Sequence, residues 1–435
     1  MKTRALAHLL EPVDLALPLD RYRDAFPSGR GGFVLDGGDF TMLGAEPFLA
    51  FRAFRSDHRR ASGALAARVV IDDRGVTTRA EVDDPLDILR VLLREHAVEP
   101  ALFGERALPL LAGAVGYLGY ETGQMLASLP CLPRPGLGMP DIALFFHDWV
   151  LGRCRSTDRA WLSVLGRGHT PAVANAEAER TRDRILSVLA SFEQRTRFPS
   201  NPAPLRASSP PSVRFAVAPV SARSVPATTS GLLASSQARL VISRDDHLSK
   251  ILTARAHIDS GAASEICLTQ RIDAPFAGDP FALWQELRRA SASPFAAFFD
   301  LPEGAVVSSS PERLLSVDQG HDGIAAIRAS FPPESMTGTP KLEAMTLLER
   351  LEPTERGVYS GALGWMDFAG PLELSVVTRT IIVKDGHAHL HVGGAIVTDS
   401  NEATEHDVTM NDARELLAAL AMLAPQDAST SGAAP

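Results

Sequence analysis

Short apolar runs separated by polar turns recur along the first part of the chain. Runs rich in branched and aromatic residues are typical of buried strands, and they occur at Gly32–Leu35, Leu111–Tyr117 and Ile142–Leu151. Apolar residues at helical spacing instead predict helices over Asp87–His96 and Ala172–Phe192. Together these elements predict a first domain over residues 1–195.

The periodic pattern stops at residues 196–237, where Pro, Ser and Ala dominate. This composition is typical of a linker or a loose surface loop. A second domain is predicted over residues 238–424, and the polar tail 425–435 is expected to be disordered.

The second domain carries clear local signals for a helix and a hairpin. Ser243 followed by Asp246 predicts a capped helix start, and Gly261 predicts its end. Two β-rich runs meet at Lys384-Asp385-Gly386, which predicts a hairpin. Because neither half alternates strands and helices in strict order, we expect an α+β fold rather than a doubly wound α/β fold.

Charge and cysteine content narrow the function classes. Of the 435 residues, 43 are Lys or Arg and 52 are Asp or Glu, so the net charge of −9 does not favour a nucleic-acid or anionic-membrane partner. No apolar stretch is long enough to predict a membrane span. Cys131, Cys154 and Cys267 match no disulfide or zinc pattern, so we expect reduced thiols in a cytoplasmic protein.

Two segments are weak matches to nucleotide-binding motifs. GAVGYLGYETG (113–123) lacks the G-x-G-x-x-G spacing, and close packing of strands explains its glycines better. TGTPK (337–341) lacks the first glycine of a P-loop, and Pro340 suits the first turn of a helix. The free N–H groups of that turn favour an anion such as a carboxylate, although a capped core helix explains the pattern equally well.

Polar residues near the C-terminus are candidates for a binding site. Arg379 lies in the apolar run ELSVVTRTIIV, so it either pairs with a structural acid or holds a substrate carboxylate. Gly393 and Gly394 would let a ligand approach the backbone closely. Glu402 and Glu405 share a helix face, which is either solvated or a source of Mg²⁺ ligands.

These segments occur in an order that resembles the chorismate-utilising enzyme family. Within the family, the chain is most similar to component I of aminodeoxychorismate synthase and next to component I of anthranilate synthase. The resemblance covers nearly the whole chain outside residues 199–236. Its most specific segments are GAASEICLTQR (261–271), PFAAFFDLPEGAVVSSSPERLL (294–315), FPPESMTGTPKLEAM (331–345), LEPTERGVYSGALGWMDFAGPLELSVVTRT (351–380) and VGGAIVTDSNEATEH (392–406).

The resemblance implies an anthranilate synthase component I-like fold of paired β-sheets flanked by helices. It also implies chorismate as substrate, Mg²⁺ as cofactor and a glutamine amidotransferase subunit as the source of ammonia. The implied product is 4-amino-4-deoxychorismate, for p-aminobenzoate and folate synthesis. The anthranilate branch carries a serine-containing motif where this chain has VLDGG (34–38), which favours the aminodeoxychorismate branch.

The resemblance also implies roles for individual residues. Tyr359 and Arg379 match a carboxylate-binding pair, and the Gly393-Gly394 loop matches a glycine loop that holds a carboxylate, although Ala395 replaces a further family glycine. The remaining matches are Thr337 and Gly338, in a loop that lines the pocket, and Glu405, a metal-binding glutamate.

The chain is shorter than the family pattern between the SPE and TG.PK motifs, which amounts to an internal deletion in the catalytic half. Only SVDQGHDGIAAIRAS (316–330) joins Leu315 to Phe331, and we expect it to form a short turn between two neighbouring strands. The family's nucleophilic lysine in P-I-K-G-T and a segment with a second metal ligand have no counterpart. No catalytic residue is therefore assigned.

Two further features separate this chain from the family pattern. The lysines Lys250, Lys341 and Lys384 offer no evident substitute for the nucleophile. In the C-terminal helix, Val408 replaces a family glutamate and Asp412 a family lysine.

Several hypotheses therefore stay open. The chain is an aminodeoxychorismate synthase component I-like enzyme whose catalytic groups are rearranged, or an anthranilate synthase component I-like enzyme. Alternatively it is a catalytically inactive member of the family, either a ligand sensor or a scaffold for an amidotransferase, or the product of a defective gene copy.

Overall fold

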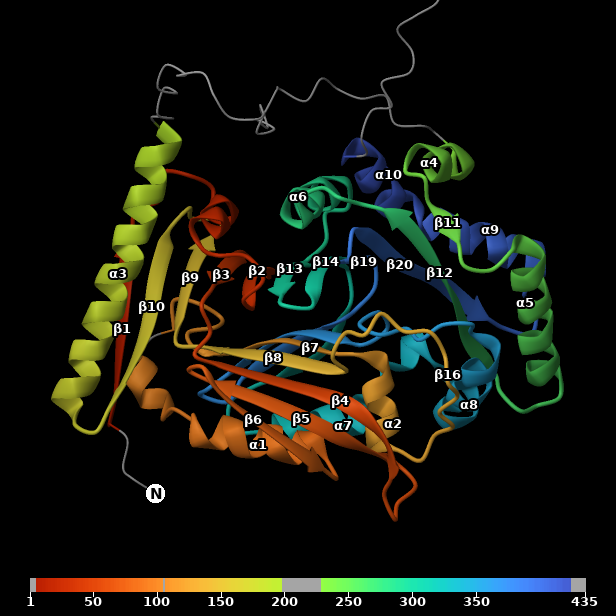
Figure 1. Ribbon diagram of the computed structural model, residues 1–435, viewed down its shortest axis with the longest axis horizontal. Coiled ribbons are helices and arrows are strands. Elements are labelled where there is room, and N and C mark those ends of the chain that lie inside the picture. The colour runs from red at the N-terminus through yellow and green to blue at the C-terminus, as the bar shows by residue number, and fades with distance from the viewer. Residues whose placement is uncertain (1–4, 105, 198–227, 424–435) are drawn as a thin grey trace, which may run out of the picture.

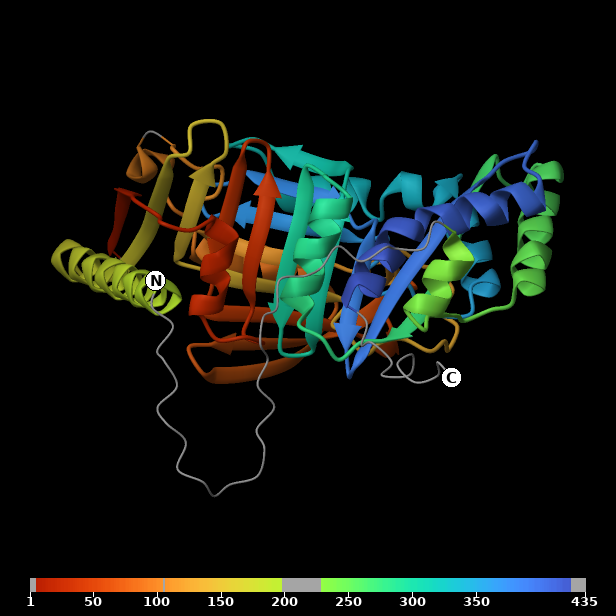
Figure 2. The same ribbon diagram turned by 90° about the horizontal axis from the view of Figure 1, so that it is seen from above.

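A computed structural model describes residues 5–104, 106–197 and 228–423 of the chain. Two antiparallel sheets lie face to face, their strands run across one another, and helices cover the outer face of each sheet (Figures 1 and 2). The expected α+β fold of paired sheets flanked by helices is confirmed. The predicted tail and most of the predicted linker lie outside the described residues.

The larger sheet has twelve strands. Its order is β1 (Ala5–Val13), β10 (Ala160–Gly168), β9 (Trp149–Cys154), β3 (Phe40–Gly44), β2 (Gly32–Gly37), β13 (Phe295–Leu301), β14 (Gly304–Ser310), β19 (Thr380–Lys384), β20 (His387–Ile396), β12 (Glu265–Pro275) and β11 (Arg239–Leu240), with β16 (Gly338–Thr339) paired to β12.

The smaller sheet has eight strands. Its order is β15 (Arg313–Val317), β18 (Leu372–Val376), β17 (Ala362–Asp367), β7 (Gly113–Leu118), β8 (Ile142–His147), β4 (Leu49–Arg59), β5 (Leu65–Asp73) and β6 (Val76–Val82).

The helices form the two outer layers and the ends of the molecule. They are α1 (Pro85–Glu95), α2 (Gly123–Leu126), α3 (Pro171–Arg197), α4 (Thr229–Ser235), α5 (Arg244–Asp259), α6 (Pro280–Ala290), α7 (Gly323–Ser330), α8 (Lys341–Leu351), α9 (Glu402–Asp412) and α10 (Arg414–Leu423). Short 3-10 turns occur at Leu19–Ala25, Pro100–Phe103, Tyr120–Thr122 and Glu334–Met336. No helix in the described ranges is long and apolar enough to cross a membrane.

Three layers of apolar packing hold the sheets and helices together. Side chains such as Phe145 and Phe299, whose ring centroids are 5.4 Å apart, fill the space between the two sheets. A second core lies between the larger sheet and α3, α6 and α10. A third lies between the smaller sheet and α1 and α7.

Both sheets combine strands from the two halves of the sequence. In the larger sheet β2 pairs with β13, and in the smaller sheet β7 pairs with β17. The expected boundary at residues 196–237 therefore separates two parts of the sequence, but strands from both parts pair within each sheet. Helix α4 also lies inside the range predicted as linker, where Thr228 caps it by accepting a hydrogen bond from the N–H of Gly231 at 3.2 Å.

Several local predictions are confirmed. Helix α5 begins after Ser243, whose Oγ accepts a hydrogen bond from the N–H of Asp246 at 3.1 Å. Strands β19 and β20 form the expected hairpin, with Asp385 and Gly386 at φ values of 50° and 76°. A Cβ at Gly116 would lie 1.9 Å from the carbonyl oxygen of Ala143, so close strand packing explains the glycine-rich segment.

The prediction of one strand over Ile142–Leu151 is wrong. The chain breaks at Asp148, so β8 joins the smaller sheet and β9 joins the larger one. A continuous apolar run does not reveal this break, because both strands are buried and read alike in the sequence.

The prediction that residues 316–330 form a short turn between neighbouring strands is also wrong. The segment ends edge strand β15 and then forms α7, which Asp322 caps by accepting a hydrogen bond from the N–H of Ala325 at 3.0 Å. Ile324 and Ile327 are buried against the smaller sheet. The shortened segment therefore connects β15 to the residues after α7 and also covers the apolar core of the smaller sheet.

Candidate functional site

A cavity of about 300 Å³ opens between strands β12 and β20 and the loops that precede β15, β19 and α8. We call it the β12–β20 cavity. Tyr359, Arg379, Gly393 and Gly394 line it together, as expected from the sequence. The other lining residues are Cys267, Pro311, Ser335, Met336, Thr378, His391, Val392, Ala395, Asp412 and Leu416.

Arg379 lies in a loop before β19, not inside an apolar strand as expected. Its φ of 47° is uncommon for a residue with a side chain, and such conformations often occur at binding sites. Its side chain is 44% exposed, with the Nη1 atom 3.3 Å from Ser291 Oγ and 3.7 Å from Glu415 Oε2. This distant ion pair leaves the guanidinium able to bind a ligand carboxylate.

Gly393 and Gly394 of β20 are glycines for different structural reasons. A Cβ at Gly393 would lie 2.4 Å from the carbonyl oxygen of Leu268, so the close approach of β12 requires a glycine there. A Cβ at Gly394 would meet only Glu405 Oε2 and Thr409 Oγ1, both at 3.9 Å. Packing does not require Gly394, which leaves ligand access to the backbone as a reason for this glycine.

Tyr359 and His391 form a stacked pair in the cavity wall. Their ring centroids are 5.3 Å apart and their planes differ by 15°. Burial raises the pKa of Tyr359 well above its usual value and lowers the pKa of His391 to about 3. At neutral pH the phenol is therefore a hydrogen-bond donor and the imidazole is uncharged.

The sequence reasoning missed His391. Its Nε2 atom is buried and has no hydrogen-bond partner among the described residues. Such an unpaired buried atom is costly unless a ligand or water satisfies it. The only sequence signal is its position two residues before Gly393 in a strand.

A buried ion pair is bonded to the backbone of two residues that line the cavity. Arg356 and Glu352 are 0% and 2% exposed, and their nearest charged atoms are 2.6 Å apart. The guanidinium of Arg356 also donates to the backbone oxygens of Cys267, at 2.7 Å, and Met336, at 2.5 Å. Because both of these residues line the cavity, the ion pair fixes two of its walls relative to each other.

Thr337 and Gly338 do not line the β12–β20 cavity, unlike their neighbours Ser335 and Met336. Thr337 is buried, and its Oγ1 atom donates to backbone carbonyl groups of the preceding turn. Gly338 lies in β16, where a Cβ would be 2.2 Å from the carbonyl oxygen of Glu265. Both residues shape the loop rather than face the cavity.

None of the described lysines lines the cavity. The Nζ atoms of Lys250, Lys341 and Lys384 donate instead to the backbone oxygens of Leu351, Pro332 and Glu303, at 2.5, 2.8 and 3.2 Å. Among the residues that the structure describes, no lysine therefore takes the position of a nucleophile.

The residues around Glu405 do not fit a magnesium site. Glu405 accepts a hydrogen bond from Ser400 Oγ at 2.7 Å, and Val408 lies one helical turn further along α9. Within the part of the chain that the structure describes, no three His, Cys, Asp or Glu side chains gather as metal ligands. Glu402, one turn earlier on α9, instead lies 3.9 Å from Arg255. Since Mg²⁺ is held by several oxygen ligands, these two glutamates are a poor site, and we assign no step to this ion.

Asp412 adds a negative charge where the resemblance implies a family lysine. It lines the cavity, and burial raises its pKa while the guanidinium of Arg379 lowers it and the carboxylate of Glu415 raises it. The net effect is a raised pKa. At neutral pH this carboxylate weakens the attraction of the cavity for anions.

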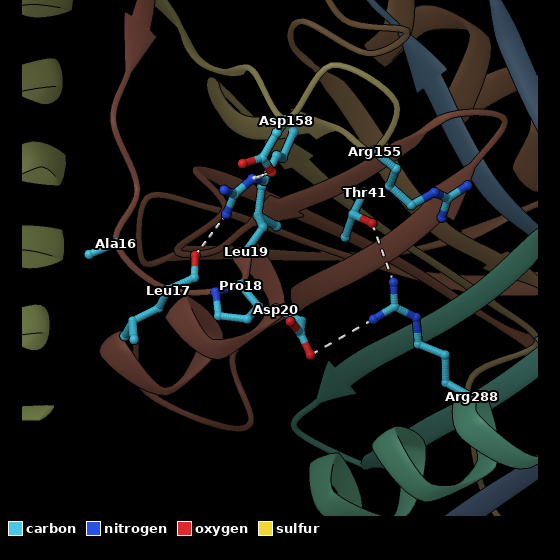
Figure 3. A pocket seen from close by; sticks show the side chains of 10 residues that line it. Ala16, Leu17, Pro18, Leu19, Asp20, Thr41, Arg155, Asp158 and Arg288 are labelled. Atoms are coloured by element: carbon cyan, nitrogen blue, oxygen red, sulfur yellow. Dashed lines mark hydrogen bonds and ion pairs between the residues drawn. The ribbon is translucent and has the colours of Figure 1, made fainter.

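A separate cavity of about 410 Å³ lies on the outer side of the larger sheet, beside α6 (Figure 3). Its charged groups are already paired, since Arg153 bonds Asp158 at 2.7 Å and Arg288 lies 3.8 Å from Asp20. None of the sequence-predicted site residues lines it.

Comparison with known proteins identifies the family. A sequence profile described as chorismate binding enzyme matches residues 56–327 and 317–418. The chain belongs to the chorismate-binding enzyme family. The two matches meet and overlap inside residues 316–330, the segment in which this chain is shorter than the family pattern.

Individual relatives include synthases of two kinds. Aminodeoxychorismate synthase component 1 of Klebsiella aerogenes is 24% identical over 79% of this chain and 84% of its own length. Anthranilate synthase component 1 of Streptomyces coelicolor is 27% identical over 82% of each chain. The crystal structure of anthranilate synthase component I from Streptococcus pneumoniae matches with a TM-score of 0.63 at 20% identity, covering 87% of this chain and 92% of that one.

Proposed function

We propose that this protein binds chorismate in the β12–β20 cavity. The observation that carries this proposal is the gathering of Tyr359, Arg379, Gly393 and Gly394 around one cavity in a member of the chorismate-binding family. Chorismate is a dicarboxylate, and guanidinium and backbone N–H groups are suited to holding carboxylates.

Each of these groups has a separate task in the proposed complex. Arg379 holds one carboxylate in place of its distant partner Glu415, and the backbone at Gly394 allows the second anionic end to approach. The phenol of Tyr359 donates a hydrogen bond, because its raised pKa keeps it protonated. The buried Nε2 atom of His391 is satisfied by a ligand hydroxyl group or a bound water.

The finer role that relatives suggest is that of an aminodeoxychorismate synthase component I. In that role the protein converts chorismate and ammonia, supplied by a glutamine amidotransferase subunit, to 4-amino-4-deoxychorismate for p-aminobenzoate and folate synthesis. Relatives named aminodeoxychorismate synthase component 1 support this role, and those named anthranilate synthase component 1 support anthranilate as the alternative product.

The cavity itself favours a second candidate, chorismate binding without the family's lysine-dependent amination. The three described lysines are bonded to backbone carbonyl groups, and Glu405 belongs to no group of three metal-binding side chains among the described residues. A nucleophile or general base typically contributes about 10²–10⁴-fold in rate, so losing such groups together removes most of the activity. In this role the protein is a ligand sensor or a scaffold for an amidotransferase.

One pair of measurements separates these roles. Purified protein is titrated with chorismate by calorimetry, and a parallel sample with chorismate, Mg²⁺ and ammonium is analysed for amino- and hydroxychorismate isomers and anthranilate. We expect heat of binding in the first sample and unchanged chorismate in the second. An amino product would instead establish the synthase role, and absence of binding would refute both.

A further inference from the structure

A second cavity, of about 360 Å³, lies beneath the smaller sheet. We call it the α1–α7 cavity, because the C-terminal half of α1 forms one wall and the start of α7 another. Both helices lie under the smaller sheet, at the bottom of the view (Figure 1). It shares no lining residue with the β12–β20 cavity. Its volume is at the lower end of the range for ligand pockets, which suits a small molecule.

The inner surface of the α1–α7 cavity is mostly apolar, and its one carboxylate, Asp367, is buried and paired with Arg106 at 2.6 Å. Met366 and Phe368 come from the end of β17 and the turn after it, Leu372 from β18, and Ile324 from α7. All four side chains belong to the core beneath the smaller sheet and are at least nine-tenths buried. A ligand that enters here therefore meets a rigid apolar surface, which favours an apolar body.

The outer rim of the α1–α7 cavity carries two arginines of α1. Arg90 lies 3.2 Å from Asp322, and its Nε atom is buried without a hydrogen-bond partner among the described residues. Arg94, one turn later on α1, makes no ion pair with any residue that the structure describes. Two other carboxylates lie close by, but Asp367 is paired with Arg106 at 2.6 Å and Asp87 with Arg328 at 2.8 Å. Arg94 is therefore the guanidinium group of the rim that is left to attract an anion.

The shortened segment builds this cavity. Five consecutive residues of that segment, Gly320 to Ile324, line it. The α1–α7 cavity is therefore formed in part by the segment in which this chain is shorter than the family pattern.

We propose that the α1–α7 cavity binds a small amphipathic monocarboxylate, either aromatic or branched aliphatic. The carboxylate lies between Arg90 and Arg94, and the apolar body packs on Phe368 and its neighbours. Guanidinium groups bind carboxylates through paired hydrogen bonds, and the apolar floor favours a hydrocarbon body over a bare anion such as phosphate.

Benzoate is the probe for this proposal, with benzamide and inorganic phosphate for comparison. Because benzoate could also enter the β12–β20 cavity, ligand-observed NMR titrations use full-length protein carrying Arg379→Gln. We expect benzoate to bind at least about tenfold more tightly than either benzamide or phosphate. Equal binding of benzoate and benzamide would overturn the proposal. Failure of chorismate to bind the unmodified protein would leave this result unaffected.

Two variants locate the benzoate site, each made in the Arg379→Gln protein. Arg94→Gln removes the unpaired charge, and Ala97→Leu fills the cavity from an exposed position on its rim. We expect each to weaken benzoate binding at least about tenfold. The matched control is Arg79→Gln, an exposed arginine of β6 outside the cavity. Benzoate binding that survives both Arg94→Gln and Ala97→Leu, or that is lost in the control, would place the ligand elsewhere and refute the assignment.

Discussion

The β12–β20 cavity, whose lining residues come from both sides of the segment 316–330 in the sequence, and the segment itself differ in how closely they follow the family pattern. In the cavity, the residues that the resemblance implies as carboxylate-binding are gathered together. In the segment, a capped helix stands where the resemblance implies the family's lysine nucleophile and a metal ligand. The residues implied in recognition and those implied in catalysis therefore belong to different stretches of chain.

The difference also extends to how the two regions are held. The cavity is supported by the fully buried pair Arg356–Glu352. Helix α7 is held by Ile324 and Ile327, which pack against the smaller sheet, and by partly exposed ion pairs between Arg328 and the start of α1. A buried pair whose partner is removed leaves an uncompensated charge, whereas an exposed pair is solvated when broken.

The largest effect on stability is expected from breaking the buried ion pair behind the cavity, compared with breaking the ion pairs of α7. Arg356→Gln leaves Glu352 buried without its partner, so we expect a loss of about 3–5 kcal/mol in the free energy of unfolding. Arg328→Gln, on α7, should cost at most about 1 kcal/mol. Urea unfolding followed by circular dichroism measures both, and similar losses in the two variants would contradict the contrast.

Removing the charge that binds the ligand should have the next largest effect. Arg379→Gln is expected to weaken chorismate binding by about 1.5–3 kcal/mol, which is roughly ten- to a hundredfold, because a hydrogen bond between charged groups is lost. Calorimetric titration gives the affinity. The control Arg313→Gln changes an arginine outside the cavity that pairs with Glu373, and it should bind chorismate as the unmodified protein does.

Replacing the two glycines of β20 by alanine should affect different properties, stability in one variant and chorismate binding in the other. Gly393→Ala places a Cβ against the backbone of β12, so we expect about 1–3 kcal/mol of destabilisation. Gly394→Ala finds only ordinary contacts and should leave the melting temperature nearly unchanged while weakening chorismate binding. If Gly394→Ala binds chorismate normally, the ligand does not approach the backbone at that position.

Neutralising Asp412 should strengthen binding by a smaller, few-fold factor. Its pKa is raised, so lowering the pH from neutral towards that pKa protonates the carboxylate and removes repulsion of the ligand. Chorismate affinity should therefore rise as the pH falls, and Asp412→Asn should bind more tightly at neutral pH and lose that part of the pH dependence. An unchanged pH profile in Asp412→Asn would exclude Asp412 as its source.

Magnesium should have the smallest effect. Because Glu405 belongs to no group of three metal-binding side chains among the described residues, removing divalent ions with EDTA should leave chorismate affinity nearly unchanged. Val408→Glu adds a carboxylate one helical turn from Glu405 and should introduce a measurable dependence on Mg²⁺. A strong effect of EDTA on the unmodified protein would show that a metal contributes to binding without this addition.

The sequence by itself determined the local elements and the order of the motifs. The cap at Ser243 and the hairpin at Asp385-Gly386 depend on residues within a few positions of each other, so their sequence signals were sufficient. The motif order identified the chorismate-utilising family and the paired-sheet fold. The motif order also located the shortened segment, but the predicted turn in that segment was wrong.

Only the tertiary structure decided what surrounds each side chain. The apolar run 142–151 gave no sign that Asp148 separates strands of two different sheets. Local sequence patterns did not predict that His391 lies in the cavity wall, that Thr337 and Gly338 do not line it, or that each described lysine bonds a backbone carbonyl group. These outcomes depend on contacts between residues far apart in the chain, and the patterns that predict helices and strands carry no information about such contacts.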